Sequence, residues 1–334
     1  MALEAKRLRA IIGGSAGNLV EWYDWYAYSA LSLYFSASFF PKGDPTAQLL
    51  NTSAVLAVGF FMRPIGAYLM GRYADRHGRK AGLAVSVALM CAVSLMIAFA
   101  PTYATIGIAA PILLLVARLL QGLSVGGEYG ASATYLSEMA TRRHRGFWSS
   151  FQYVTLIGGM LSALAVTLLL QAVFTKAQMD SFGWRIAFAL GAALALGVYL
   201  LRRGLAETAS FRALAVDRPA SGMAALWRAH PREFLLVGAI SAGGGLAFYA
   251  YTTYMQKFLA NTVGFSVQTA TAIMTAALVV FMLVQPLFGA LADRVGRKPM
   301  LLLFGIGGAI VSVPVFSALE NVRTPGAAFA IVLV

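Results

Sequence analysis

Charged residues and cysteine are scarce in this 334-residue chain. Asp, Glu, Lys and Arg together make up 12% of it, with one cysteine and three histidines. A soluble protein of this length needs far more polar side chains to cover its surface. A lone cysteine builds no disulfide framework or thiolate site, and the histidines lack ligand-like spacing. We therefore expect no metal site and no cofactor.

Hydrophobic residues dominate instead, at 59% of the chain, and the mean hydropathy is +0.73. Successive apolar runs of about 20 residues match the roughly 30 Å hydrocarbon thickness of a bilayer. The fold class predicted is therefore an all-α polytopic membrane protein. Nine complete helices are predicted, with a tenth beginning near 326, at 11–38, 52–73, 81–100, 108–135, 150–173, 184–202, 234–256, 268–291 and 299–319.

Basic residues cluster in alternate connections between these helices. One side of the membrane holds 19 of the 26 basic residues, whereas the other holds only Lys42, Lys176, Lys257 and Arg323. Positive charge marks the cytoplasmic side, so the N-terminus is predicted to be cytoplasmic. The net charge of +13 thus reports topology, and no nucleic-acid partner is expected.

A ten-residue motif occurs twice. GRYADRHGRK at 71–80 and GALADRVGRK at 289–298 both match G-x-x-x-D-R-x-G-R-K. Each follows an apolar helix, which predicts a six-helix unit repeated twice. The expected parts are an N-terminal six-helix bundle at 1–203, a cytoplasmic linker at 204–233 and an incomplete C-terminal bundle at 234–334. Twelve helices would need more chain, so we expect a C-terminally shortened product rather than a protein with fewer spans.

The two loop motifs, the paired halves and the basic linker resemble the major facilitator superfamily. GNLVEWYDWY, FFMRPIGA and ARLLQGLSVGGEYGASATYLSE narrow the resemblance to its metabolite:proton symporter family. The resemblance implies a monomeric symporter in the bacterial inner membrane that imports a small organic acid with protons by alternating access. A dicarboxylate such as α-ketoglutarate is favoured, with shikimate, citrate or proline and betaine as alternatives.

The repeated loop motif has its own expected role. Asp75 lies one turn after Gly71, where its carboxylate could accept hydrogen bonds from Arg79 or from free N–H groups at a neighbouring helix start. Gly71 and Gly78 permit close approach and a tight turn. The resemblance implies a latch that stabilises the outward-open state, formed by Gly71, Asp75, Gly78, Arg79, Asp293 and Arg297. A plain positively charged loop would need neither the aspartates nor the glycines.

Arg118 lies deep in the apolar run VARLLQG, where a charge is costly. It should face the bundle interior and meet an acid or a substrate anion. Arg118, Gln121 and Gly122 match the R-x-x-Q-G motif that the resemblance associates with proton coupling. Asp24, about 13 residues into the first helix, is predicted to be near mid-membrane and is our first candidate for the proton carrier.

Two further acids accompany this pair. Glu21 lies three positions before Asp24, hence on the same helical face, and is either a second titrating group or a structural partner. Glu128 is about 15 Å along the helix from Arg118 and cannot reach the same spot. A functional role for Glu128 and a pairing near the cytoplasm stay equally open.

The substrate site is predicted from another buried cation. Arg63 precedes Pro64 near mid-membrane, and a planar guanidinium suits a carboxylate. Arg185 is expected to close the outer end of the same cavity, or else to anchor the helix beside Trp184. Weaker ligand candidates are Tyr28, Tyr249 and Lys257.

Other function classes find less support. No nucleotide-binding motif points to ATP-driven transport, and no nucleophile–base pair or ligand cluster lies at depth to indicate an enzyme. A membrane sensor, a uniporter and an exchanger stay open as alternatives.

Overall fold

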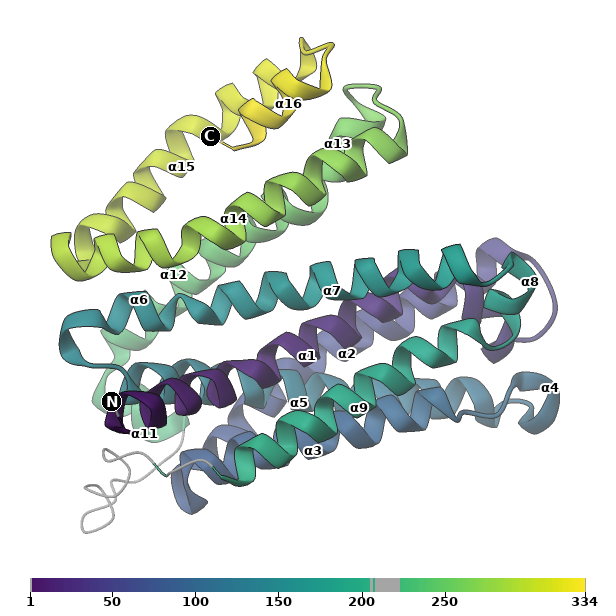
Figure 1. Cartoon of the computed structure of the whole chain (residues 1–334), viewed down its shortest axis with the longest axis horizontal. Coiled ribbons are helices and arrows are strands. Elements are labelled where there is room, and N and C mark those ends of the chain that lie inside the picture. Colours follow the sequence, from purple (N-terminus) through teal and green to yellow (C-terminus); the bar gives the residue numbers. More distant parts are fainter. Residues whose placement is uncertain (1, 205–206, 208–222, 334) are drawn as a thin grey trace. The chain divides into compact units, whose positions relative to one another are not determined.

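The computed structural model describes residues 2–204, 207 and 223–333, and all regular structure there is helical (Figure 1). Each of the nine predicted membrane helices has a counterpart in this part of the chain. These counterparts are α1 (Ala2–Phe39), α2 (Pro45–His77), α3 (Arg79–Ala98), α5 (Ala109–Met139), α7 (Phe151–Val173), α9 (Trp184–Arg203), α12 (Pro231–Tyr249), α14 (Val267–Val295) and α15 (Arg297–Glu320). Most extend beyond the predicted ends. The predicted linker at 204–233 lies largely outside the described residues.

Short helical segments join the long ones. They are α4 (Tyr103–Ile106), η1 (Arg142–His144), α6 (Arg145–Ser149), α8 (Lys176–Gln178), η2 (Met179–Gly183), α11 (Met223–Ala229), η3 (Ala250–Tyr254), α13 (Met255–Asn261) and α16 (Pro325–Val332). The last of these begins where the tenth helix is predicted. Two of them, η2 and η3, are wide π-type turns that continue into the following α-helix.

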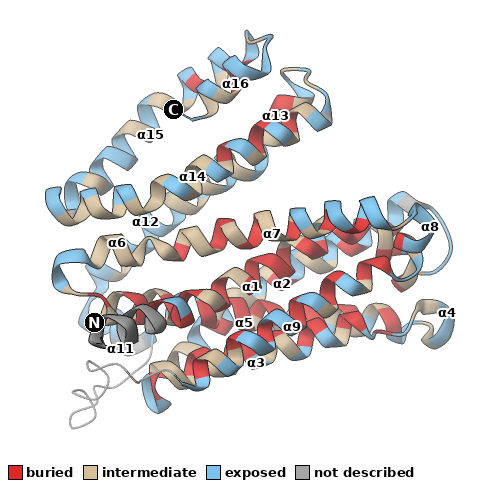
Figure 2. Cartoon of the chain, viewed as in Figure 1, coloured by how far each residue is buried: buried red, intermediate tan, exposed pale blue. Residues whose placement is uncertain are grey.

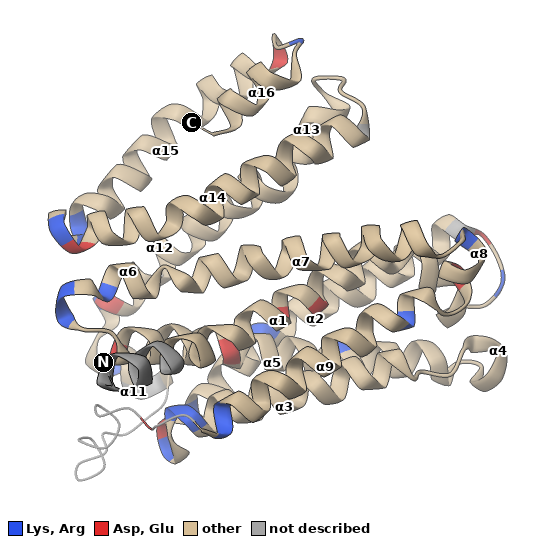
Figure 3. Cartoon of the chain, in the orientation of Figure 1, with Lys and Arg blue, Asp and Glu red and all other residues tan. Residues whose placement is uncertain are grey.

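Eight helical stretches in the described chain are long and apolar enough to cross a membrane. The first helix, α1, has 38 residues but carries Asn18, Glu21 and Asp24 at its centre. All three side chains are buried inside the bundle, so α1 meets its neighbours through polar contacts. Figure 3 shows charge gathered at the helix ends and little of it along α7, α12, α14 and α15.

Local sequence signals set the helix ends. The Asp44 side chain accepts a hydrogen bond from the Thr46 amide at 2.9 Å, and Pro45 follows as the first residue of α2. The turns after α2 and α14 contain Gly78 and Gly296, with φ of 113° and 102°. Glycine adopts such angles without the Cβ penalty, so both copies of the motif make the same sharp turn.

By its contacts the chain divides into two compact units, 1–141 with 155–221 and 142–154 with 222–334. The change near 221 falls within the predicted linker. The segment 142–154, expected in the N-terminal bundle, groups instead with the second unit. The six-helix domain boundaries themselves stay a prediction.

The first unit is built around α1. Figure 2 shows buried residues concentrated along α1, α3, α5 and α9. Tyr23, Leu31 and Phe35 of α1 are fully buried and share a core with Trp184 and Phe188 of α9. Phe35 packs against both α9 rings with centroid distances of 5.6 and 6.0 Å. Aromatic packing therefore fixes the end of α1 nearest α8.

The second unit has a smaller core of its own. Met255 and Leu259 of α13 pack with Ala270 of α14, Leu319 of α15 and Ala328 of α16. The remaining surfaces of α12, α14 and α15 carry mostly exposed or half-buried apolar residues (Figure 2). Such surfaces suit a lipid environment, where apolar side chains need no protein partner.

Candidate functional site

Asp24 and Arg118 meet in the interior of the first unit. Oδ2 of Asp24 in α1 lies 3.7 Å from Nη2 of Arg118 in α5, and both side chains are fully buried. The Asp24 carboxylate also accepts hydrogen bonds from Ser94 of α3, at 2.7 Å, and from Gln121. Three helices thus converge on one carboxylate, and Asp24 and Arg118 are partners as the sequence predicts.

Arg118 is held by its surroundings more than by hydrogen bonds. Its guanidinium carbon lies 3.9 Å from the centre of the Tyr28 ring, a cation–π contact. None of its three side-chain nitrogens makes a hydrogen bond within the described protein. The Tyr28 hydroxyl, a predicted substrate ligand, instead donates to the Thr52 carbonyl at 3.0 Å. The Asp24–Arg118 contact is therefore a loose ion pair.

The residues of the R-x-x-Q-G motif lie on two faces of α5. Arg118 and Gln121 point to α1, whereas Gly122 faces α2. A Cβ on Gly122 would lie 2.1 Å from the Gly59 carbonyl oxygen, so only glycine lets the backbones approach this closely. This close packing holds Arg118 and Gln121 against Asp24.

Glu21 lies one turn before Asp24 and also meets α5. Its Oε1 accepts a hydrogen bond from Ser124 Oγ at 2.6 Å. Ser124 Oγ is also 2.8 Å from the Ser86 carbonyl oxygen of α3. The two acids predicted on one face of α1 are therefore both buried, in separate contacts with α5.

Glu128 pairs with an arginine from the basic end of α9. Arg202 is one of the basic residues that the charge distribution assigns to the cytoplasmic side, and its side chain is fully buried. Its guanidinium forms an ion pair with Glu128 and donates to the carbonyls of Gly13 and Leu83, at 2.9 and 2.6 Å. Ser86 Oγ donates to Glu128 as well, at 2.6 Å.

The signal that identifies Arg202 lies in its spacing. The buried residues of α9 recur every three or four positions, and Arg202 continues that stripe after Gly191, Ala195 and Val198. Its neighbour Arg203 is exposed. Helical periodicity therefore separates these two arginines, whereas the positive charge of the helix end does not.

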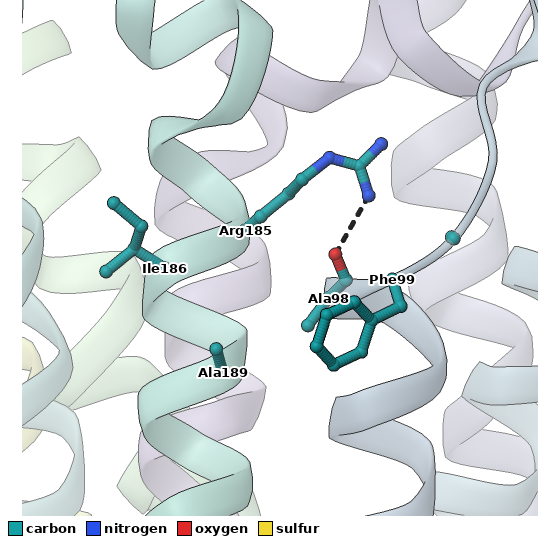
Figure 4. A pocket seen from close by; sticks show the side chains of 6 residues that line it. Ala98, Phe99, Arg185, Ile186 and Ala189 are labelled. Carbon is teal, nitrogen blue, oxygen red and sulfur yellow. Dashed lines mark hydrogen bonds between the residues drawn. The ribbon is translucent and has the colours of Figure 1, made fainter.

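Arg63 and Arg185 occupy different surroundings. The guanidinium of Arg63, a half-buried residue, stacks on Phe60 at 4.0 Å and Trp25 at 4.4 Å. Arg185 stacks on Trp184 at 4.3 Å and donates to the Ala98 carbonyl at 2.8 Å (Figure 4). These two arginines share none of these contacts. Ala98 ends α3, so Arg185 satisfies one of the carbonyls left free at that helix end.

An open pocket lies beside this contact. It is lined by Ala98, Phe99 and Ala100 on one side and by Arg185, Ile186 and Ala189 on the other. Figure 4 shows the Arg185 side chain extending toward Ala98, away from Ile186 and Ala189. Its lining is apolar apart from Arg185. Both predicted roles of Arg185, closing the substrate cavity and anchoring the helix beside Trp184, stay predictions.

The two remaining ligand candidates lie in the second unit. Tyr249 ends α12 with 39% of its surface exposed, and its ring packs edge-on against Phe248. Lys257 is an exposed residue of α13. Their proposed ligand roles stay predictions.

The first copy of the loop motif contains its predicted ion pair. Arg79, the first residue of α3, pairs with Asp75, and its Nε lies 4.0 Å from Glu138. The amides of Arg79 and Lys80 donate to the Glu207 carboxylate at 3.1 and 3.2 Å. Glu207 thus caps the start of α3, a contact that no local pattern predicts.

The second copy of the loop motif makes different contacts. Asp293 accepts hydrogen bonds from the amides of Gly146 and Phe147, at 2.6 and 2.9 Å, at the start of α6. This is the other arrangement predicted for the motif carboxylate, a neighbouring helix start. Arg297 is exposed. Gly289 allows the approach, because a Cβ there would lie 2.5 Å from the Gly146 carbonyl oxygen.

Within the described residues, no cluster of three or more His, Cys, Asp or Glu side chains could hold a metal ion.

Sequence comparison extends the resemblance. The Major Facilitator Superfamily matches residues 16–334. The chain is 55% identical to an alpha-ketoglutarate permease of Escherichia coli, over 98% of this chain and 76% of that protein. It is 33% identical to a citrate-proton symporter of Klebsiella pneumoniae, over 94% and 71%. A proline/betaine transporter of Escherichia coli is 31% identical over 95% of this chain and 66% of its own length.

Solved structures agree on the fold. A structure of the proton:xylose symporter XylE superposes with a TM-score of 0.79, covering 99% of this chain and 78% of that one, at 19% identity. An inward-open form of XylE from E. coli gives 0.61, with the same 99% and 78% coverage and 19% identity. At this identity the likeness is one of fold.

Proposed function

The chain belongs to the major facilitator superfamily, and from that premise we propose that it is a proton-coupled symporter that imports a small organic acid. Its relatives and its fold are those of multi-pass membrane transporters rather than enzymes. The observation that carries the proposal is the buried Asp24–Arg118 pair, where a titratable carboxylate meets a cation between α1 and α5.

Coupling follows from the loose geometry of this pair. At 3.7 Å, with no direct hydrogen bond to Arg118, the Asp24 carboxylate is held to the guanidinium by charge attraction alone, so neutralising the carboxylate removes what holds the pair together. A carboxylate that loses a nearby cation inside a low-dielectric bundle gains affinity for a proton. Asp24 thus takes up a proton when the pair opens and releases it when the pair closes.

The substrate proposed is a dicarboxylate, α-ketoglutarate in particular. The 55% identity to an alpha-ketoglutarate permease supports this choice over citrate or proline and betaine. Arg63 is the proposed carboxylate ligand, because the residue is only half-buried and its guanidinium presents a planar fork beside aromatic rings. Arg185, Tyr28, Tyr249 and Lys257 are secondary candidates.

The cellular location proposed for the protein is based on the distribution of its basic residues and on its family. We place the protein as a monomer in the bacterial inner membrane with a cytoplasmic N-terminus, since basic residues mark the cytoplasmic side. The two motif loops act as conformational latches in this proposal, and the capping of α6 by Asp293 supports that role.

Uptake measurements test the proposal. Vesicles containing the protein should accumulate labelled α-ketoglutarate when an inward proton gradient is imposed. Asp24→Asn should abolish the stimulation by the gradient. Asp44→Asn is the matched control, because Asp44 is exposed and asparagine also caps helices. Equal uptake with and without the gradient would refute symport.

Substrate competition tests the choice of ligand. Excess unlabelled α-ketoglutarate should inhibit uptake more strongly than citrate, proline or betaine. Arg63→Ala should raise the apparent KM for the dicarboxylate. Unchanged affinity in Arg63→Ala would remove Arg63 from the substrate site.

A further inference from the structure

The buried charges of the first unit do not balance if every acid is ionised. Among the described residues, its fully buried ionisable side chains include the carboxylates Glu21, Asp24 and Glu128 and the guanidiniums Arg118 and Arg202. Arg118 pairs with Asp24 and Arg202 pairs with Glu128. Glu21 is left as the surplus acid, since no described cation lies within 4.0 Å of its carboxylate.

The one hydrogen-bond partner of Glu21 points to its protonation state. Ser124 Oγ lies 2.6 Å from Glu21 Oε1 and 2.8 Å from the Ser86 carbonyl oxygen. A hydroxyl has one proton, so it cannot donate to both acceptors. If Glu21 is a neutral acid, its own O–H donates to Ser124, and Ser124 donates to Ser86. Both short contacts of the Ser124 hydroxyl are then hydrogen bonds.

The charges facing Glu21 come from several helices. Glu128 of α5, Arg202 of α9 and Arg63 of α2 act on it from beyond ion-pair distance. Arg202 forms an ion pair with Glu128, and Arg63 stacks on Phe60 and Trp25. Asp24 is the other acid on α1 itself. The helix α3 contributes the Ser86 carbonyl, which Ser124 contacts, and the Cys91 thiol in the cluster around Val20; α7 has no ionisable side chain apart from Tyr153.

We propose that Glu21 binds a proton in this structure and is a second proton site on α1, one turn from Asp24. The proposal rests on the proposed function, in which protons are co-transported. With Glu21 neutral, the two ion pairs leave the contact between α1 and α5 without net charge. If Glu21 ionises, an unpaired charge remains in that contact, which favours separation of the two helices and entry of water. Proton loss from Glu21 is thereby coupled to opening.

Infrared spectroscopy of the purified full-length protein in lipid nanodiscs tests this directly. A protonated carboxyl has its own C=O stretching band, which shifts to lower frequency in heavy water. We expect such a band in the unmodified protein at neutral pH. It should disappear in Glu21→Gln and persist in Asp24→Asn, the matched control on the same helix face. Each variant is first checked by gel filtration and thermal unfolding.

Ser124→Ala keeps the proposal testable if Glu21→Gln does not fold. Removing the hydroxyl should retain the band and move it to higher frequency, because the acid loses its hydrogen-bond acceptor. The proposal is overturned if the unmodified protein lacks the band, if Glu21→Gln retains it, or if Asp24→Asn is the variant that loses it. The spectrum needs no substrate, so a protein that shows the band but fails to take up α-ketoglutarate contradicts the proposed function alone.

Discussion

Individual buried ions differ in how completely the bundle pairs them. Glu128 has an ion pair with Arg202 and a hydrogen bond from Ser86, and Arg202 also donates to three backbone carbonyls. Arg118, by contrast, has one ionic contact at 3.7 Å and an aromatic ring. The first arrangement joins α5 and α9 through several contacts. The second leaves Arg118 with a single ionic partner.

Removing Arg202 should therefore destabilise the protein strongly. Arg202→Ala leaves Glu128 as an uncompensated buried charge, for which we expect a loss of about 3–5 kcal/mol in the free energy of unfolding. The fall should appear as a lower thermal-unfolding midpoint in detergent.

The neighbouring arginine supplies the control for this experiment. Arg203→Ala removes the same side chain from an exposed position, so its midpoint should match that of the unmodified protein. Equal midpoints for Arg202→Ala and Arg203→Ala would show that the buried pair does not stabilise the fold.

Whether the sequence predicts the partner of a charged residue depends on how far that residue stands out from the segment around it. Asp24 and Arg118 are ions inside apolar runs, so the sequence alone shows that each needs a partner. Arg202 ends a helix and precedes another arginine, so its charge indicates only membrane topology. Glu207 is unpredictable in a different way, because its contact with Arg79 spans 128 positions and no local pattern encodes it.

Glycines allow some pairs of helices to pack closely, because they leave no side chain between the two backbones. Along the contact of α2 with α5, a Cβ on Gly66 would lie 2.3 Å from the Leu123 carbonyl oxygen, and one on Gly126 would lie 2.1 Å from that of Arg63. Side chains there would push the two helices apart. The spacing of these glycines therefore fixes the depth at which Arg63 and Arg118 lie relative to each other.

Two glycines of α2 give a matched test. Gly66→Ala should cost about 1–3 kcal/mol of stability through overpacking, read as a lower unfolding midpoint. Gly71→Ala should cost little, because no atom lies within 4 Å of an added Cβ there. If both changes are neutral, α2 and α5 tolerate more separation than this contact implies. Lost uptake in a stable Gly71→Ala variant would instead support a latch role in another state.

The two motif loops show why identical motif residues make different contacts. Both turns are built on a glycine with positive φ, in agreement with the tight turn that the motif predicts. Asp75 pairs within its own loop, whereas Asp293 caps a helix start distant in sequence. Which partner each carboxylate takes depends on which helix start is within reach, and spacing along the chain contains no information on that.

Hydrogen exchange tests the capping of α6. Asp293→Ala removes the carboxylate that accepts the Gly146 and Phe147 amides, with an expected loss of about 0.5–2 kcal/mol of local stability. Peptides covering 142–150 should therefore exchange faster. The matched variant Asp75→Ala should leave this segment unchanged. Faster exchange in both variants, or in neither, would contradict the specific role of Asp293.

For the molecule as a whole, the membrane orientation rests on the uneven distribution of basic residues. The connections predicted to be external carry few cations, among them Lys42 and Lys176, and both are exposed. Arg143 and Arg294, also exposed, lie in the basic connections predicted to be cytoplasmic. Because these connections alternate along the chain, the arrangement predicts opposite sides of the membrane for the two sets.

The single cysteine makes this orientation measurable. Cys91→Ser removes the only native thiol and keeps a hydroxyl for its contact with the Ala192 carbonyl. Cysteines placed one at a time at Lys42, Lys176, Arg143 and Arg294 can then be probed with a membrane-impermeant maleimide. The first two should react in intact cells, and the last two only after permeabilisation, because retained positive charge faces the cytoplasm. The reverse pattern would invert the molecule and place the Asp75 and Asp293 loops outside. Labelling of all four in intact cells would mean that these connections do not lie on opposite sides, and the predicted arrangement of spans would fail with them.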